Sequence, residues 1–399
     1  MPTASTANAA RPQPAPSAAG LPWWGLSALF MAAFTAVMTE LLPAGLLLRM
    51  GDSLQVPEGR VGFLVTAYAA ASFLAAIPLT AALRGQPRRR VLIGTLAGFA
   101  LCNAVTAFSS SYGLTFAARL VAGAMGGTLW AMLAGCAARM VPAERRGRAI
   151  AVVLAGITVA LCLGVPAGTA LASVFGWRAA FAALAVLPLA LVVWVRLCVP
   201  GLPGEPAGGR MPLRRVATLR GIPGVLAVTL LLLLGHQAMY TYLGPFAGRA
   251  GFPQAGVVLF VFGIATVAGI WTVGVVVDRH LRAALLTALG VIGGAMLVLG
   301  AAGDRPAVML VAVGVWGAAF GGAPTLLQTS LVGSSGPANA DVATSMQATV
   351  YNVGIAGGSL TGGVVLDGAG AAWLPWTALP LVLAALVACG GLLRPAAPR

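Results

Sequence analysis

Apolar runs of about twenty residues recur along the whole chain, and short segments that hold most of the arginines separate them. A helix needs about 20 predominantly apolar residues to cross the hydrocarbon core of a bilayer. The runs do not alternate apolar and polar residues in segments of about ten, as the strands of a membrane β-barrel do. The pattern predicts twelve membrane-spanning helices, at 22–48, 61–83, 91–109, 114–138, 149–173, 179–199, 222–246, 256–277, 283–303, 306–331, 341–366 and 375–393.

Two segments stand outside this pattern. Residues 1–20 are rich in Ala, Pro and Ser, a composition typical of a disordered tail. Residues 200–221 begin with a Pro/Gly-rich linker and continue with a basic part, Arg210 to Arg220, suited to lie as a short helix on an anionic membrane surface. The predicted parts are therefore a tail (1–20), a six-helix half (21–199), a cytoplasmic linker (200–221) and a second six-helix half (222–394).

The composition agrees with an all-α polytopic membrane protein. Hydrophobic residues make up 59% of the chain and charged residues only 8%, whereas a soluble domain has about 25% charged residues. All 24 basic residues are Arg, and 18 of them fall in segments that are cytoplasmic if the N-terminus is inside. The positive-inside rule then predicts that both termini are cytoplasmic. The absence of Lys, together with abundant Ala, Gly and Arg, favours a bacterial source, so we expect a bacterial inner membrane. The net charge of +15 is thus explained by topology, and no nucleic-acid partner is expected.

Several kinds of chemistry are excluded or unsupported. The chain has no Lys, which excludes a GxxxxGK phosphate loop and a Schiff-base lysine. Its five cysteines are scattered without a CxxC pair, so we expect them to pack in the core. The two histidines, His236 and His280, are far apart in sequence. We therefore expect no metal, no cofactor and no enzymatic activity, and a membrane-embedded enzyme or a channel is only a weak alternative.

The chain contains a weak internal repeat. A shift of 194 positions superimposes small residues of spans four and five on those of spans ten and eleven. The aligned pairs include Gly123 with Gly317, Gly127 with Gly321, Gly164 with Gly358, Gly168 with Gly362, and Gly176 with Gly370. Two six-helix halves in parallel orientation are a transporter architecture, with the substrate site between the halves near mid-membrane.

The loops after spans two and eight carry a related motif. They read "LRGQPRRRVLIG" (83–94) and "GVVVDRHLRAALL" (274–286), and they resemble the two copies of the G-x-x-x-D-R-x-G-R loop of the major facilitator superfamily. That resemblance implies a twelve-helix fold and alternating access, with the loop latching the cytoplasmic side. The first copy departs from the motif at Arg84 and Pro87, where plain positive-inside anchoring is the alternative. The motif positions carried over are Arg88, Arg89, Arg90, Gly274, Asp278, Arg279 and Arg282.

Span five has a second motif in Gly156, Gly164, Pro166 and Gly168. It is similar to the span-five motif of the superfamily's drug:proton antiporters, although Val165-Pro166 replaces the usual Gly-Pro pair. Residues 351–370 resemble the corresponding segment of the arabinose-efflux-permease-like branch. The alternative is that these small residues serve only close helix packing.

One carboxylate lies inside the first apolar run. Glu40 is the only charged residue between Leu21 and Leu48, and Arg119 in span four lies at a similar depth in the outer half. A charge in the membrane core costs roughly 2.5–3.5 kcal/mol on insertion scales, so two opposite charges at one depth can offset each other in part. In the superfamily, spans one and four line the same cavity, and an Arg at this place recurs in antiporters. The resemblance therefore implies that Glu40 carries a proton and Arg119 promotes its release; a static ion pair is the alternative.

Candidates for the substrate cavity come from the central spans. Span seven contains His236, Gln237 and Tyr240, and the 194-residue shift places His236 where Leu42 stands in span one. Hydrogen-bonded packing is the alternative for His236. Large or polar residues of other central spans complete the set: Trp130, Gln328, Tyr351 and Asn352.

The sequence thus predicts a proton-coupled efflux transporter that exchanges protons for small drug-like or antibiotic compounds. The alternative substrates are sugars or other small polar metabolites. The expected partners are the substrate, protons and the lipid bilayer, and the chain is expected to be monomeric.

Overall fold

The computed structural model describes residues 21–83, 85–142, 145–203, 217–219, 221–252, 255–335 and 340–392. The predicted tail and residues 204–216 of the predicted linker lie outside the described residues. Within the described part every regular element is a helix. These are α1 (Trp23–Leu41), η1 (Leu42–Gly45), α2 (Leu47–Leu54), α3 (Glu58–Ala82), α4 (Arg88–Phe108), α5 (Tyr112–Arg139), α6 (Arg146–Val159), η3 (Ala160–Gly164), α7 (Val165–Phe175), α8 (Trp177–Cys198), α10 (Ile222–Tyr240), α11 (Leu243–Gly248), α12 (Ala255–Ala302), α13 (Pro306–Ser335), α14 (Ala340–Ala369), η5 (Ala371–Trp373) and α15 (Leu374–Leu392).

The prediction of twelve spans is confirmed. Twelve helical segments of the described residues are long and apolar enough to cross a membrane, and each overlaps one predicted span. Two details differ from the prediction. The loop expected between spans eight and nine is helical, because α12 runs through both. Span five is built from α6, η3 and α7, where the π-helical turn η3 precedes Pro166, a residue without an N–H for helix hydrogen bonding.

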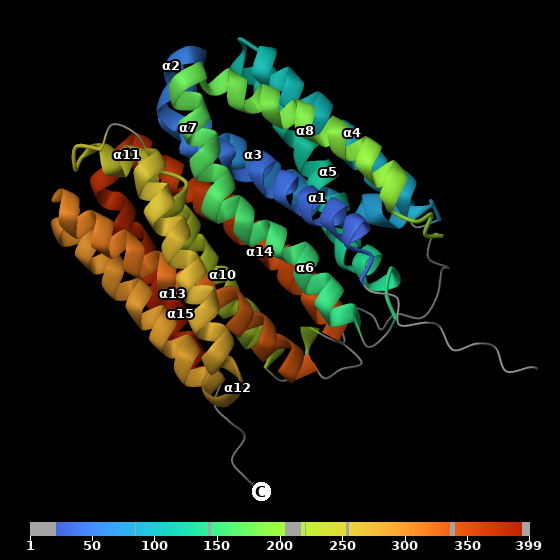
Figure 1. The fold of residues 1–399 in the computed structure, drawn as a ribbon. Coiled ribbons are helices and arrows are strands. Elements are labelled where there is room, and N and C mark those ends of the chain that lie inside the picture. The colour runs from blue at the N-terminus through green and yellow to red at the C-terminus, as the bar shows by residue number, and fades with distance from the viewer. Residues whose placement is uncertain are drawn as a thin grey trace, which may run out of the picture.

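The helices form two bundles that lie side by side (Figure 1). One contains α1 to α8 and the other contains α10 to α15, and we call them the N-terminal half and the C-terminal half. The halves meet where α3 packs along α14 and where η3 and α7 pack against α12.

The internal repeat extends to atomic contacts. Gly123 of α5 packs on the backbone of Tyr68 in α3, and Gly317 of α13 packs on the backbone of Phe262, which is 194 positions after Tyr68. One turn further, Gly127 packs on Ser72 and Gly321 packs on Thr266, again with the same shift. Gly176 and Gly370, which start the helical segments after spans five and eleven, both have a left-handed backbone, with φ of 83° and 88°. The predicted alignment of spans four and ten is therefore confirmed.

Direct bonds join the two halves at the end of the molecule that holds α2 and the α14–η5 connection, which we call the contact end. The backbone N–H of Gly59, in the first turn of α3, donates to a carboxylate oxygen of Asp367 in α14 at 3.2 Å. A carboxylate at a helix N-terminus satisfies a free N–H and interacts favourably with the helix dipole. Deeper along the same interface, the Thr66 hydroxyl donates to the Ala356 carbonyl at 3.3 Å.

Tyr242 closes the contact end between these bonds. It is fully buried, and its hydroxyl donates to the Ser359 carbonyl at 2.7 Å. Its ring lies against Gly62 of the N-terminal half and Gly363 of the C-terminal half. Glycine at both positions gives the ring room to enter the interface between the halves.

The hydrophobic core has two parts. One cluster of buried residues combines the contact-end parts of α1, α3, α7 and α8 with residues from the whole C-terminal half. The second cluster consists of residues of the N-terminal half and the segment that follows α8. The halves thus share one core at the contact end and have separate cores toward the opposite end. This arrangement is that of a molecule closed at the contact end.

We expect Gly62→Ala to weaken closure of the contact end. A Cβ at this position would overlap the ring of Tyr242, which cannot swing away because its hydroxyl is bonded to Ser359. Spin labels at Leu48 and Leu366, which line one cavity at this end from opposite halves, should give a longer mean distance in the variant. The control is Gly94→Ala, where a Cβ meets no atom within 4 Å. An unchanged distance distribution in Gly62→Ala would contradict this account of closure.

Candidate functional site

Glu40 lies one residue before the end of α1, inside the protein. Its side chain is 5% exposed, and its Oε1 atom accepts no hydrogen bond within the described residues. Burying an ionised carboxylate without a hydrogen-bond donor or a counter-charge costs many kcal/mol, and binding a proton removes the charge. The site is thus built around an acid whose ionised form is disfavoured by burial.

Arg119 lies on α5 and is 1% exposed. Its guanidinium binds backbone carbonyls: Nε donates to Leu64 at 3.2 Å, Nη2 donates to Glu40 at 2.8 Å, and Nη1 donates to Thr39. The guanidinium carbon also lies 4.8 Å from the ring centre of Tyr68, which adds a cation–π contact. One side chain therefore joins α5 to the end of α1 and to the middle of α3.

Pro43 explains why α1 offers a carbonyl to Arg119. In a continuing α-helix the carbonyl of Thr39 would accept the N–H of residue 43. Residue 43 is a proline, which has no N–H, and the chain there passes into the 3₁₀ turn η1. The Thr39 carbonyl is left without its helical partner, and the guanidinium takes that place.

The alternative reading of Glu40 and Arg119, a static ion pair, does not describe this conformation. The two residues are in contact, but the contact is between the guanidinium and the backbone carbonyl of Glu40. Within the described residues the carboxylate of Glu40 makes no ion pair, and Arg119 is held by carbonyls instead. The physical reason is that the helix end presents unsatisfied carbonyls in the reach of a planar five-donor group.

Two residues outside the predicted site complete its surroundings. The Asn103 amide donates to the Thr39 hydroxyl at 3.0 Å and to the Leu184 carbonyl at 3.1 Å, and so fixes the same end of α1. Tyr68 is fully buried beneath Arg119. The sequence does not predict Tyr68, because an aromatic residue in an apolar span has no pattern that distinguishes a functional residue from a core residue. Asn103 carried a signal, since a buried amide in a span needs partners.

His236 lies in a cluster of five rings in the C-terminal half. Its imidazole stacks on Phe320 with ring centres 3.5 Å apart and on Tyr240 at 5.3 Å. The edge-on Trp316 ring lies 5.2 Å away and Phe262 lies 5.8 Å away. His236 is 5% exposed, and neither its Nδ1 atom nor the Trp316 indole nitrogen has a hydrogen-bond partner among the described residues. The expected alternative of hydrogen-bonded packing therefore does not describe Nδ1.

The structure corrects the register of span seven against span one. In the N-terminal half, Gly164 packs on Phe34 and Met38, whereas the equivalent Gly358 packs on Leu234 and Ala238. Both partners are shifted by 200 positions, not by 194. Tyr240, and not His236, is then the counterpart of Glu40, while Leu42 corresponds to Tyr242. The prediction that His236 stands at the Leu42 position is wrong, because the two halves differ by six residues between these helices.

The other candidate cavity residues are dispersed. The Gln237 amide donates to the Thr241 hydroxyl, which bonds in turn to Ser359, so Gln237 belongs to a polar contact between α10 and α14. Gln328 is exposed. Trp130 packs against both hydrophobic clusters, and Tyr351 and Asn352 are half-buried on α14. None of these residues lines the cavity between α2 and α14 at the contact end, and none lines the cavity between η1, α7 and α12.

The small residues of span five pack on span one along its length. Gly156 lies against the Phe30 backbone, Gly164 against Met38, and Gly168 against Leu42. Just before Pro166, the backbone of Cys162 meets Gly263 of the C-terminal half. The motif thus brings α1, which holds Glu40, and α12 of the other half against the same helix.

The described loop-motif residues bind within their own halves. The Arg88 N–H donates to the Leu202 carbonyl and Arg89 donates to Val199, while Arg90 is exposed. Arg282 donates to the Gly390 carbonyl at 2.8 Å. The structure does not describe the surroundings of Gly274 or the side chains of Asp278 and Arg279. These bonds fit the anchoring alternative for the first copy, where the motif lacks its Asp.

A comparison of the sequence with known protein families agrees with the fold, the repeat and the buried charges. The model of the Major Facilitator Superfamily matches residues 28–359. The chain belongs to the Major Facilitator Superfamily. The members of this superfamily are membrane transporters, so the chain transports a small-molecule substrate across a bilayer by way of its twelve helices.

Its relatives within the superfamily include exporters. The chain is 31% identical over 353 residues to the purine ribonucleoside efflux pump NepI of Salmonella paratyphi B, with 86% of this chain and 88% of the relative covered. It is 28% identical over 348 residues to a probable sugar efflux transporter of Mannheimia succiniciproducens, with 86% of each chain covered. The human organic anion transporter MFSD10 (TETRAN) shares the fold, with a TM-score of 0.69, 19% identity and coverage of 93% of this chain and all of that one.

We expect Arg119→Ala to destabilise the protein far more than Arg178→Ala. Removing the guanidinium removes three hydrogen bonds from a charged donor, each worth about 1.5–3 kcal/mol, and leaves the Thr39 carbonyl without a partner. Arg178 is the matched control, because it also donates two hydrogen bonds but to Ser53 and the Ser109 carbonyl near the surface. Unfolding of purified protein in detergent should show a loss of at least about 3 kcal/mol for Arg119→Ala only.

Arg119→Lys separates charge from geometry in the same measurement. Lysine keeps the positive charge but lacks the planar fork that reaches several carbonyls at once. It should therefore fall well short of restoring stability. Wild-type stability in Arg119→Lys would show that the charge alone matters.

Proposed function

We propose that the protein is a proton-coupled exporter, with Glu40 as the residue that carries the proton. The observation that supports this most directly is the buried Glu40 carboxylate whose Oε1 lacks a hydrogen bond. Arg119 lies beside it but is occupied by backbone carbonyls, so it contributes a fixed positive charge without a permanent ion pair. Such a carboxylate can exchange a proton without first breaking a salt bridge.

The direction and the membrane are part of the same proposal. The arginine distribution favours a bacterial inner membrane with both termini in the cytoplasm. The contact end then faces outward, and the conformation described above takes up substrate from the cytoplasm. Export also agrees with the names of the two bacterial relatives, which are efflux proteins.

The relatives shift the proposed substrate from drug-like compounds toward the alternative, a sugar- or nucleoside-like metabolite. Within that class a purine nucleoside fits best, because it joins a polar ribose to a flat aromatic base. The ring cluster around His236 in α10, α12 and α13 provides aromatic faces that suit a base. Export of flat drug-like compounds is the second candidate, and the same ring cluster favours it.

The proposal is tested by transport in proteoliposomes that contain the purified full-length chain. Radiolabelled adenosine, arabinose and the drug-like cation ethidium are compared under an imposed pH difference. Uphill movement of adenosine, opposite to the proton gradient, is the expected result. Movement of ethidium alone would favour the second candidate, and movement of none of the three would count against this substrate proposal.

We expect Glu40→Gln to abolish uphill transport driven by a pH difference. The amide is close in size to the carboxylic acid but cannot release a proton, so the coupled step is lost while the fold is kept. Substrate binding to the detergent-solubilised variant, measured by thermal stabilisation, should stay within about threefold of wild type. The control is Asp304→Asn, which changes an exposed acid near the contact end and should transport normally. A full substrate gradient in Glu40→Gln would exclude this residue as the proton carrier.

We further expect transport of a neutral substrate to respond to membrane potential. If one proton enters for each neutral molecule exported, one charge moves in each cycle. A potential of 100 mV then supplies about 2.3 kcal/mol, which can sustain a gradient of roughly 50-fold. Proteoliposomes with the potential and the pH difference imposed separately should show transport with either. Dependence on sodium without any effect of pH would refute proton coupling, and a need for ATP would refute secondary transport.

A further inference from the structure

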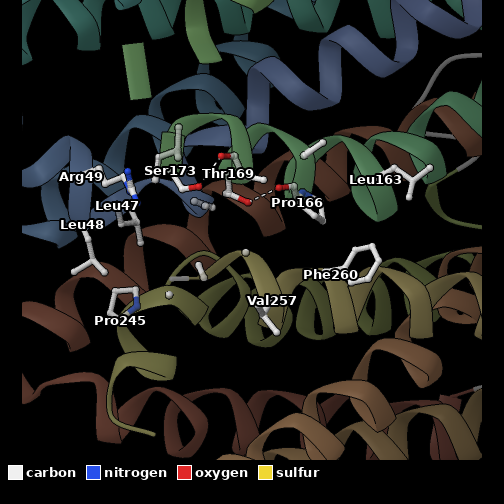
Figure 2. A pocket seen from close by; sticks show the side chains of 18 residues that line it. Leu47, Leu48, Arg49, Leu163, Pro166, Thr169, Ser173, Pro245, Val257 and Phe260 are labelled. Carbon is white, nitrogen blue, oxygen red and sulfur yellow. Dashed lines mark hydrogen bonds between the residues drawn. The ribbon is translucent and has the colours of Figure 1, made fainter. Parts of the chain in front are cut away.

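A cavity of about 520 Å³ lies between the two halves at the contact end (Figure 2). Its walls are η1 and the start of α2, the helix η3–α7, the helix α11 and the first turns of α12. Most of the lining side chains are apolar. This volume falls in the range of about 300–1,000 Å³ that is typical of pockets for small organic ligands.

The two ends of the cavity differ in chemistry. Arg49 and Ser173 lie at one end, and Leu163 and Phe260 lie at the other (Figure 2). The Ser173 hydroxyl is bonded within its own helix, to the Ala170 carbonyl, which leaves the guanidinium as the main polar group. Nη1 of Arg49 donates to the Ala172 carbonyl at 2.7 Å, which holds the side chain against the last turn of α7. Its Nε and Nη2 atoms donate to no group within the described residues and remain available for an anion.

The cavity spans about half of a membrane. Ser173 lies near the end of span five, which ends at Phe175, and Leu163 lies ten residues earlier on the same helix. Ten residues of helix rise about 15 Å, and the hydrocarbon core of a bilayer is about 30 Å thick. The cationic end is therefore at the level of the lipid headgroups, and the apolar end reaches toward the midplane.

The cavity is open to the surrounding membrane. Leu163 and Val257 are each 55% exposed and Phe260 is 44% exposed, although all three line the cavity. These residues belong to membrane-spanning segments of both halves, so their exposed faces are accessible to lipid chains.

Both halves are needed to form this cavity. Gly45 of η1 lies close to Leu259 of α12, and Gly256 of α12 lies close to Thr169 of α7. Separation of the halves at the contact end would divide the cavity between them. A ligand that contacts both walls would bind the closed state more tightly and shift the equilibrium toward it.

We propose that this cavity binds one anionic phospholipid from the leaflet at the contact end, with its phosphate on Arg49 and an acyl chain along Leu163 and Phe260. A long apolar cavity that opens to lipid and carries one available cation at headgroup depth matches this ligand in both charge and extent. The bound lipid bridges the halves and favours closure of the contact end. The binding site does not depend on the proposed function; only an effect on transport rate would rest on it.

Native mass spectrometry of the full-length chain tests this proposal without any transport measurement. The protein is titrated with dioleoylphosphatidylglycerol in detergent, and dioleoylphosphatidylcholine serves as the neutral competitor. We expect one phosphatidylglycerol molecule to be retained by wild type and not to be displaced by equal phosphatidylcholine. Arg49→Gln should weaken retention at least about tenfold, because a charge-assisted bond to phosphate is lost.

A second variant tests the apolar part of the site. Ala167 lines the middle of the cavity, and Ala167→Phe fills it while leaving Arg49 unchanged. This variant should also lose the retained lipid. The controls are Arg178→Gln, another arginine near this end, and Val186→Phe, an exposed position on α8 that is outside the cavity. Both controls should retain phosphatidylglycerol as wild type does.

Three outcomes would overturn the proposal. Equal retention in all variants would show that the lipid binds elsewhere. Equal retention of phosphatidylcholine would show that Arg49 does not select an anionic headgroup. Displacement of phosphatidylglycerol by adenosine or ethidium, one molecule for one, would identify the cavity as a substrate portal. Failure of proton-driven transport with normal lipid retention would leave this site in place and reject only the proposed function.

Discussion

The guanidinium of Arg119 is the interaction on which the N-terminal half depends. It brings α5, α1 and α3 together through hydrogen bonds to three backbone carbonyls, from a side chain that is 1% exposed. Hydrogen bonds to a charged group contribute about 1.5–3 kcal/mol each, and burial of one ion costs several kcal/mol, so a single bond would not hold the charge there. Three bonds and the contact with the Tyr68 ring together hold the charge in place. The same arrangement leaves the Glu40 carboxylate without the partner that the sequence suggests.

The two halves share their packing but not their chemistry. Glycines 194 positions apart pack on backbone atoms 194 positions apart in α3–α5 and α12–α13, so the helix frame is duplicated. At the place of Arg119 the C-terminal half has Val313, and the 200-residue register of span seven places Tyr240 at the position of Glu40. Charges thus occupy one side of the pseudo-symmetric frame, and a cluster of rings around His236 occupies the other. Under the proposed function, a frame of this kind would separate the proton site from an aromatic surface for the substrate.

Much of the fold could be predicted from the sequence because the bilayer limits the possibilities. The length of the apolar runs follows from the thickness of the bilayer, and the twelve spans agree with it. The glycine repeat follows from close helix packing and is present in both halves. The site is less predictable because it depends on backbone atoms. The sequence contains Pro43, but the residue types of Glu40 and Arg119 do not show that Pro43 frees the Thr39 carbonyl to bind Arg119. The predicted register of His236 was wrong for a related reason. The glycine repeat lies in spans four, five, ten and eleven, so it cannot reveal a six-residue difference in the position of span seven.

Alternating access requires that the contact end can open at an affordable cost, and the bonds across it fit that requirement. The polar contacts described there are the Gly59–Asp367 and Thr66–Ala356 hydrogen bonds, each worth about 0.5–3 kcal/mol depending on charge. Their sum is similar to the roughly 2.3 kcal/mol that one charge gains from each 100 mV of membrane potential. The path from Glu40 to this interface is short, because α1 ends at Leu41 and η1 directly touches α11 and α12 of the other half. Under the proposed function, a change of charge at Glu40 would therefore act five residues from the junction between the halves, where Gly45 lies against Leu259.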